Sequence, residues 1–158
     1  LITRYASEIS QCQPVRPGKA EVLRNGSDMV IVALGSMVYP AMEAAEELAV
    51  IGINATVVNA RFAKPFDIKL LLDLSKKTDK FLVVEEGIVD GGFGGAVMEF
   101  FRSQDINVNI RLLGLPNMFI EHGPRKDLLE KYGLSTESIV RIAKSMSSQA
   151  NHAGSRRF

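Results

Sequence analysis

The sequence has few of the residues that build disulfides and metal sites. Its 158 residues include one cysteine, Cys12, and two histidines, His122 and His152. A single cysteine excludes a disulfide within the chain and a cysteine-based zinc site, and two histidines alone do not complete a metal centre. We therefore predict that this chain by itself binds no metal and no cofactor, and that it works in the cytoplasm.

Long apolar runs and an excess of one charge are also missing. The formal net charge is +1, with 19 basic and 18 acidic residues, so no basic stripe is available for a nucleic-acid partner. The longest apolar runs are strand-sized, which argues against a membrane span. The sequence begins with Leu1 and shows no signal-peptide pattern, so we expect a piece of a longer protein.

What the sequence does contain is a regular alternation of strand and helix patterns. Apolar, strand-like runs occur at residues 20–23, 29–34, 55–59, 80–85 and 108–113. Helical patterns occur at residues 36–49, 65–77, 94–102, 127–132 and from 135 onward. This alternation predicts βαβ crossovers and an α/β fold, with three α/β/α layers and a mostly parallel sheet of about five strands.

Local signals refine this outline. Asn25 and Gly26 tolerate positive φ and separate the first two strand patterns, which predicts a hairpin and one antiparallel strand at an edge of the sheet. Ser36 and Ser135 are expected to cap the helices that follow them, and Gly52 to end one. We expect residues 1–18 to be a linker or the tail of a preceding domain, 19–148 the domain, and 149–158 a flexible tail.

Glycine-rich segments follow two of the strand patterns, at residues 85–87 and 91–95. The second is not a dinucleotide fingerprint, because Val97 stands where Gly or Ala is required and Phe93 would crowd a pyrophosphate. Close backbone packing explains these glycines better. Glu85 and Glu86 are adjacent on a strand and point to opposite faces, so they cannot form a carboxylate pair. One of them is expected to face the crevice at the carboxyl end of the sheet.

A third segment, residues 114–123, carries more functional side chains than a simple connection requires. Phe119, Glu121 and His122 lie in it between two glycines, and ordering such a loop costs entropy. His122 could be a general base, but no Ser or Cys nucleophile accompanies it, so a structural or interface hydrogen bond is favoured. We predict no catalytic residue. The candidates for an interface or an active-site edge are Glu85, Glu86, Phe119, Glu121 and His122.

These motifs resemble the C-terminal domain of the transketolase superfamily, the thiamine diphosphate enzymes. The broadly shared segments are residues 35–38, 60–67 and 84–87, and the resemblance covers residues 15–148. The segment 114–123, with the stretch 128–135, is similar to the 1-deoxy-D-xylulose-5-phosphate synthases. The resemblance implies the dimerisation and scaffold domain of an enzyme that condenses pyruvate with glyceraldehyde 3-phosphate and releases carbon dioxide. It also implies that two preceding domains, or a separate subunit, hold thiamine diphosphate and Mg²⁺, that the full enzyme is a homodimer, and that the isolated chain is inactive.

One residue departs from the pattern of that family. Ser7, in Arg4-Tyr5-Ala6-Ser7, stands where the family carries the second arginine of Arg-Tyr-Pro-Arg, which binds substrate phosphate. This departure keeps two alternatives open, and the lack of the cofactor-binding domains in this sequence keeps a third. They are the C-terminal domain of a transketolase proper, that of a 2-oxo-acid dehydrogenase β subunit, and an assembly module without turnover.

Overall fold

A computed structural model of the chain describes residues 14–148. The expectations for Ser7, Cys12, His152 and the tail 149–158 concern positions outside the described residues. Among residues 14–148, no helix combines the length and the apolarity needed to cross a membrane.

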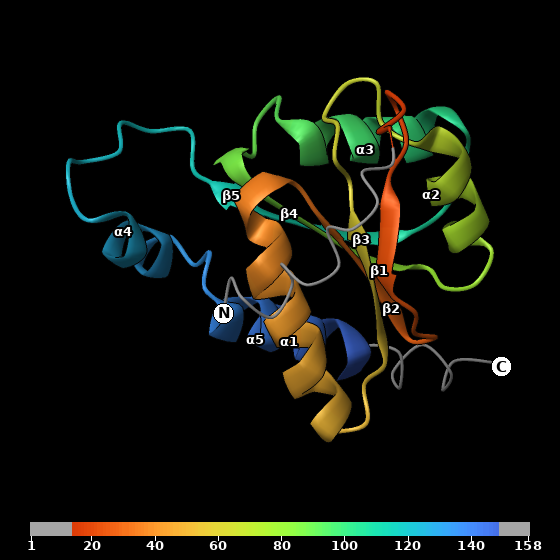
Figure 1. Cartoon of the computed structure of the whole chain (residues 1–158), viewed down its shortest axis with the longest axis horizontal. Helices are drawn as coiled ribbons and strands as arrows, with labels where there is room; N and C mark the ends of the chain where they lie inside the picture. Colours follow the sequence, from red (N-terminus) through yellow and green to blue (C-terminus); the bar gives the residue numbers. More distant parts are fainter. Residues whose placement is uncertain (1–13, 149–158) are drawn as a thin grey trace, which may run out of the picture.

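Five strands form one sheet with the order β1-β3-β2-β4-β5 (Figure 1). The strands are β1 (Glu21–Arg24), β2 (Met29–Ala33), β3 (Ala55–Asn59), β4 (Lys80–Ile88) and β5 (Asn109–Leu115). Strands β2, β3, β4 and β5 run parallel to one another, and β1 pairs antiparallel with β3 at one edge. The predicted mostly parallel sheet with one antiparallel edge strand is confirmed.

Helices cover both faces of this sheet. They are α1 (Val38–Val50), α2 (Ile68–Ser75), α3 (Phe93–Ser103), α4 (Arg125–Lys131) and α5 (Thr136–Ser148), and a 3-10 turn, η3 (Gly35–Met37), leads into α1. Helices α1 and α5 pack on one face, and α2 and α3 pack on the other (Figure 1). The three-layer prediction is therefore confirmed, and α4 lies beside the end of β5, away from the main layers.

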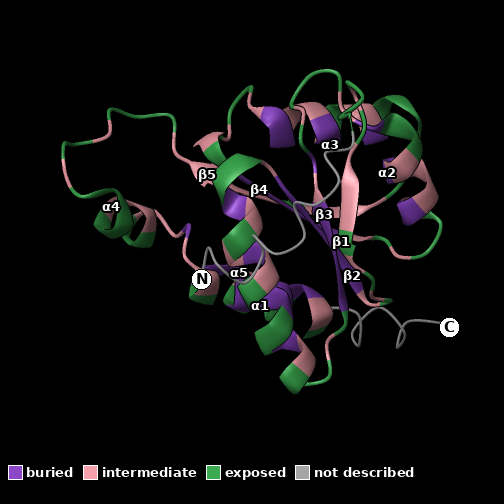
Figure 2. Ribbon diagram, viewed as in Figure 1, coloured by how far each residue is buried: buried purple, intermediate pink, exposed green. Residues whose placement is uncertain are grey.

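Strand β2 shows why a continuous apolar run marks the centre of such a sheet. Its Met29 and Ile31 belong to the core under α1 and α5, while Val30 and Val32 belong to the core under α2 and α3. All five residues of β2 are buried (Figure 2). A strand that is covered on both faces is apolar at successive positions and does not alternate between polar and apolar residues.

The predicted hairpin between the first two strands is wrong, although its antiparallel edge strand is present. Strand β2 is bordered by β3 on one side and β4 on the other, so no edge of β2 is free to pair with β1. The connection instead crosses the start of β3. There the Gly26 N–H donates to Thr56 Oγ1 at 3.0 Å, and the Thr56 hydroxyl donates to the Gly26 carbonyl at 2.8 Å. Strand β1, which precedes this connection in the chain, pairs with the edge of β3 that faces away from β2.

Two of the predicted helix ends are confirmed. Gly52 has a φ of +82° just after α1, and its N–H donates to the Ala49 carbonyl, as expected of a helix-ending glycine. Ser135 accepts a hydrogen bond from the Ser138 N–H at 3.3 Å at the start of α5. The helix predicted from residue 65 begins later, at Ile68, because the Asp67 carboxylate caps it by accepting from the Leu70 N–H.

Candidate functional site at the carboxyl ends of β2 and β4

The order of the strands places a topological switch point between β2 and β4. The chain leaves β2 toward β3 on one side, and then returns past β2 to reach β4 on the other. Open α/β sheets bind ligands in the crevice outside the carboxyl ends of the strands at such a point. Residues 34–36 follow β2 there, and Glu85 and Glu86 lie near the end of β4.

A bulge in β4 positions the two glutamates. Val84 is paired with Leu113 and Ile88 with Leu115, so four residue steps on β4 lie opposite two on β5. The additional residues fall at 85–87, which we call the β4 bulge. Bulges of this kind bend a strand and re-aim its side chains. As predicted, Glu85 and Glu86 point to opposite sides, and each has a different set of partners.

Glu85 points inward, toward the start of α3. It is 7% exposed, and its carboxylate accepts hydrogen bonds from the Phe93 N–H at 3.1 Å and the Gly94 N–H at 2.8 Å. These are amides of the first turn of α3, whose partial positive charge favours an anion. Glu85 is therefore a buried anchor for α3 and does not face the crevice.

The glycines around Glu85 make room for its side chain. A Cβ on Gly87 would lie 2.7 Å from Glu85 Oε2, and a Cβ on Gly92 would lie 2.6 Å from Glu85 Oε1. On β5, a Cβ on Gly114 would lie 2.8 Å from the Gly87 carbonyl and 3.4 Å from Glu85 Cγ. The common neighbour of these three glycines is the Glu85 side chain. The close packing predicted for the segment 91–95 is confirmed at Gly92, but not at Gly91, where a Cβ would meet nothing within 4 Å and the φ is +76°.

Glu86 faces the switch point. Its carboxylate accepts hydrogen bonds from the Ser36 hydroxyl, from Arg125 Nε at 2.9 Å and from Arg125 Nη2 at 2.5 Å. The prediction that Ser36 caps a helix is therefore wrong, because its hydroxyl is used across the crevice and not at α1. The two donor residues lie in η3, just after β2, and at the start of α4, so Glu86 joins three segments that are distant in sequence.

The same contacts shift the titration of this pair. Hydrogen bonds from Arg125, and then the bond from Ser36, hold the pKa of Glu86 below its ordinary value, although partial burial opposes them. The bond to Glu86 in turn raises the pKa of Arg125. The pair is thus fully ionised at neutral pH.

We expect Arg125→Gln to raise the pKa of Glu86 toward that of an ordinary glutamate, because the largest cause of its depression is removed. A depressed pKa contributes stability above the unfolded-state pKa that is lost as the pH falls through the folded-state value. The wild-type protein should therefore lose this contribution only in acid. Carboxyl NMR titration of both proteins measures the effect.

Asp73 is a matched control for this titration. Bonds from Lys69 and Lys76 lower its pKa to about 2, and these partners lie on α2 and just after it, on the opposite face of the sheet from α1. Its titration should stay the same in the variant. A Glu86 pKa that did not move would contradict the bidentate pairing of Glu86 with Arg125.

The other three predicted residues lie on the loop of residues 116–124, between β5 and α4. Phe119 is 92% exposed, as expected for an anchor in an isolated domain. Glu121 forms an ion pair with Lys131 of α4, and His122 is exposed. The Val89 N–H donates to the Leu115 carbonyl at 3.0 Å, so the predicted proximity of segments 85–95 and 114–123 at one edge is confirmed. Their role as an interface remains a prediction.

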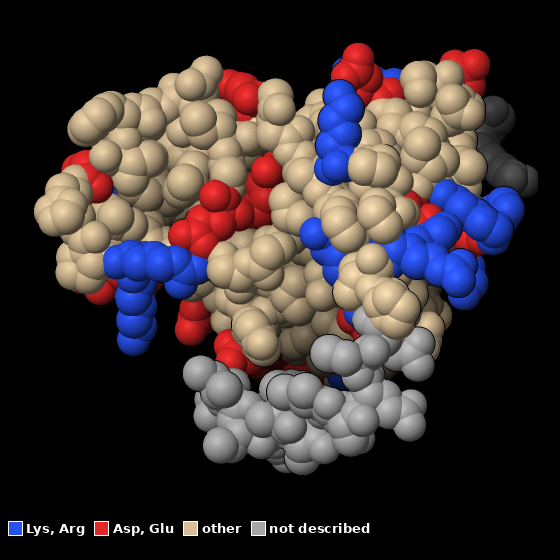
Figure 3. All heavy atoms as spheres, turned by 45° about the horizontal axis from the view of Figure 1, so that its top comes forward, with Lys and Arg blue, Asp and Glu red and all other residues tan. Residues whose placement is uncertain are grey.

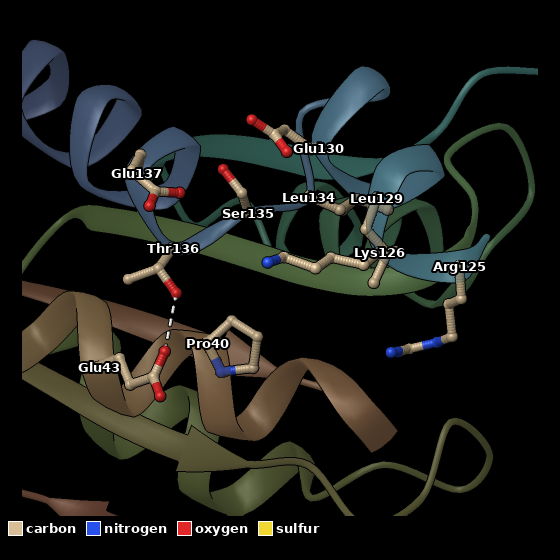
Figure 4. A pocket seen from close by; sticks show the side chains of 10 residues that line it. All are labelled: Pro40, Glu43, Arg125, Lys126, Leu129, Glu130, Leu134, Ser135, Thr136 and Glu137. Carbon is tan, nitrogen blue, oxygen red and sulfur yellow. Dashed lines mark hydrogen bonds between the residues drawn. The ribbon is translucent and has the colours of Figure 1, made fainter.

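A groove of about 470 Å³ lies beside this edge, between the start of α1, α4 and the start of α5 (Figure 4). Its lining includes Leu129 and Leu134, together with both acidic and basic side chains. Thr136 donates to Glu43 at 3.0 Å across it. Of the residues that bond to Glu86, Arg125 lines this groove.

Charges around the site do not converge as metal ligands do. Among residues 14–148, no three His, Cys, Asp or Glu side chains are grouped so that they could hold a metal ion. Figure 3 shows acidic and basic side chains interspersed on the face that it displays. The described residues therefore offer no such grouped ligand set for the Mg²⁺ that the resemblance implies, and no metal ligand is assigned to them.

Sequence reasoning missed two members of the site, Ser36 and Arg125. Ser36 stood at a helix start, where capping is the usual role, and Arg125 is separated from Glu86 by 39 positions. No local spacing links them. Only the position of Arg125 directly after a loop rich in functional side chains pointed toward this edge.

Comparison with known proteins identifies the family to which this chain is related. The family model "Transketolase, C-terminal domain" matches residues 18–139. The chain is 46% identical to the 1-deoxy-D-xylulose-5-phosphate synthase of Desulforudis audaxviator over 81% of its length. It is 45% identical to synthase 1 of Geobacter metallireducens over 86% of its length. It spans 20% and 22% of these two relatives, respectively.

A solved structure of a transketolase has the same fold. It is described as "Split gene transketolase, inactive beta4 tetramer". The TM-score is 0.79 at 37% identity, over 85% of this chain and 44% of that one.

Proposed function

Because this chain belongs to the transketolase C-terminal domain family, we propose that it is the C-terminal domain of a 1-deoxy-D-xylulose-5-phosphate synthase. The observation that carries the proposal is the identity of 45–46% to synthases over more than four fifths of the chain. The reaction of such an enzyme joins pyruvate to glyceraldehyde 3-phosphate with loss of carbon dioxide. Thiamine diphosphate, with Mg²⁺, supplies the carbanion chemistry when bound, and in this proposal other domains bind both.

The contribution of this chain is then assembly. Residues 19–148 form the domain, and residues 1–18 and 149–158 flank it as a linker and a tail. The edge formed by the β4 bulge and the loop 116–124 contacts the cofactor-binding domains, either in the same polypeptide or in a separate subunit. The full enzyme is a cytoplasmic homodimer. Support comes from the share of its relatives that the chain spans, about a fifth, and from an exposed aromatic side chain at this edge.

A transketolase proper is the second candidate. The solved neighbour carries that name, and it matches this chain at 37% identity. That neighbour is described as an inactive β4 tetramer of a split-gene transketolase. This description also supports the idea that such a domain can belong to a polypeptide separate from the rest of the enzyme. The same description of the neighbour, an inactive tetramer, also supports a third candidate, a function in assembly without turnover.

The proposal is tested by complementation. The Geobacter metallireducens synthase, expressed without its own C-terminal domain, is mixed with this chain, pyruvate, glyceraldehyde 3-phosphate, thiamine diphosphate and Mg²⁺. We expect no carbon dioxide release from either polypeptide alone, and turnover from the mixture. The relative's own C-terminal domain, added separately, is the positive control.

Two results would contradict the proposal. Turnover by this chain alone would mean that it is a complete enzyme. If the relative's own domain restored turnover and this chain did not, the assignment of this chain to a synthase would be wrong. A truncated transketolase host, assayed in parallel, distinguishes the second candidate.

A further inference from the structure

We propose that the ion pair Glu86–Arg125 pins the loop 116–124 to the β4 bulge, so that Phe119 meets the cofactor-binding domains in one orientation. This inference rests on the proposed function for its partner. In this view Glu86 and Arg125 are positioning residues for assembly and take no part in chemistry.

Both ends of the loop are held by the same short segment of β4. At its start, Leu115 is paired with Ile88, and its carbonyl accepts from the Val89 N–H at 3.0 Å. At its end, Arg125 binds Glu86 through two nitrogens, at 2.9 and 2.5 Å. The loop thus leaves and rejoins the body on residues 86–89, as in a compact loop with closed ends.

Between its two ends, the loop has few buried contacts, and an exposed ion pair joins Glu121 to Lys131 of α4. Phe119 is 92% exposed and Met118 is 58% exposed, so neither packs into a core. The Met118 N–H donates to the Pro116 carbonyl at 2.8 Å, which is a contact within the loop itself. A segment with few buried contacts opens at low free-energy cost. The order of the loop therefore depends on the two end contacts and on the exposed Glu121–Lys131 pair.

The geometry at Glu86 fixes the loop more firmly than an ordinary surface ion pair would. A guanidinium that donates two hydrogen bonds to one carboxylate fixes both position and angle. The Ser36 hydroxyl of η3 adds a third donor, and Glu85 fixes the other side of the bulge by its hydrogen bonds to the first turn of α3. Exposed pairs contribute little to global stability, so the effect should appear in loop order and in binding.

The occupant that fits this surface is the set of cofactor-binding domains. The synthases that this chain resembles are about four times its length, since the 81–86% of the chain that aligns with them spans 20–22% of their length. A large aromatic residue that is presented in advance by a closed loop lowers the ordering cost of association. The two ends of the loop, and the residues of the bulge, would then form one rigid docking edge.

Hydrogen exchange of the isolated chain tests the pin without any partner. We expect Glu86→Gln to speed amide exchange of residues 117–123 by about three-fold or more, a size in keeping with one exposed ion pair. Arg125→Gln should do the same, and the double variant should add nothing. Glu21→Gln, which removes a 2.5 Å pair with Arg61 at the edge strand β1, is the matched control and should leave this loop unchanged.

Binding is then measured by titrating each variant into the truncated Geobacter metallireducens synthase and following restored turnover. We expect Glu86→Gln to raise the concentration needed for half-restoration by about three-fold or more, with the same maximal turnover. Unchanged loop exchange would overturn the inference. So would faster exchange with unchanged half-restoration. If the wild-type chain restored no turnover, the proposed function would be wrong. The hydrogen-exchange result would still test whether the Glu86–Arg125 pair orders the loop.

Discussion

Replacing Gly92 with alanine is expected to destabilise the domain by about 3 kcal/mol or more. The new Cβ would lie 2.2 Å from the Ile88 carbonyl and 2.6 Å from Glu85 Oε1. The φ of Gly92 is −76°, so the penalty comes from the clash and not from backbone strain. Both neighbours are held, because Ile88 is paired with β5 and Glu85 is bonded to α3.

Gly95 provides the control for this substitution. A Cβ there would lie 3.4 Å from the Val89 carbonyl, an ordinary contact, and Gly95 is within α3. Gly95→Ala should therefore leave stability unchanged or raise it by up to about 1 kcal/mol, the difference in helix propensity. Urea unfolding of both variants decides the matter. Equal unfolding midpoints for the wild type and Gly92→Ala would show that the packing around Glu85 is looser than these distances imply.

Replacing Phe119 with alanine is expected to leave the isolated domain intact and to weaken assembly. Its side chain is almost fully exposed, so the change in unfolding free energy should stay within about 0.5 kcal/mol. If Phe119 anchors the proposed interface, its loss should cost roughly 2 kcal/mol of association, as for a central hot spot. Half-restoration of turnover in the truncated synthase would then require about thirty times more chain.

Val50→Ala is the matched control, since Val50 is an apolar side chain that is 87% exposed. It lies at the end of α1 that is remote from the loop 116–124 (Figure 1). Neither stability nor complementation should change in this variant. If Phe119→Ala lowered stability while complementation was unaffected, Phe119 would be a structural residue and the proposed interface would be wrong.

Several features of this protein follow from local sequence alone. The apolar run of β2, the helix α1 and the cap at Ser135 were predictable because each depends on residues close together in the chain. Adjacent positions on a strand point to opposite faces, so the separate surroundings of Glu85 and Glu86 were predictable as well. The exposed position of Phe119 followed from its place in a polar loop.

Other features depend on which segments meet, and no local pattern contains that information. The Asn25-Gly26 turn could not reveal that both edges of β2 are taken by β3 and β4. The capping role expected of Ser36 was replaced by a bond to a carboxylate 50 positions away. Glycines near residues 87, 92 and 114 were visible, but their common cause, the Glu85 side chain, was not.

Periodicity and short motifs are local properties, so they were enough to predict the strands, the helices, the three layers and the family of this chain. The order of the strands, the anchoring of the β4 bulge on both sides and the pairing of Glu86 with Arg125 emerge only from the folded arrangement. These depend on free strand edges, on the space that missing side chains leave, and on charges brought within bonding distance only when the sheet has formed.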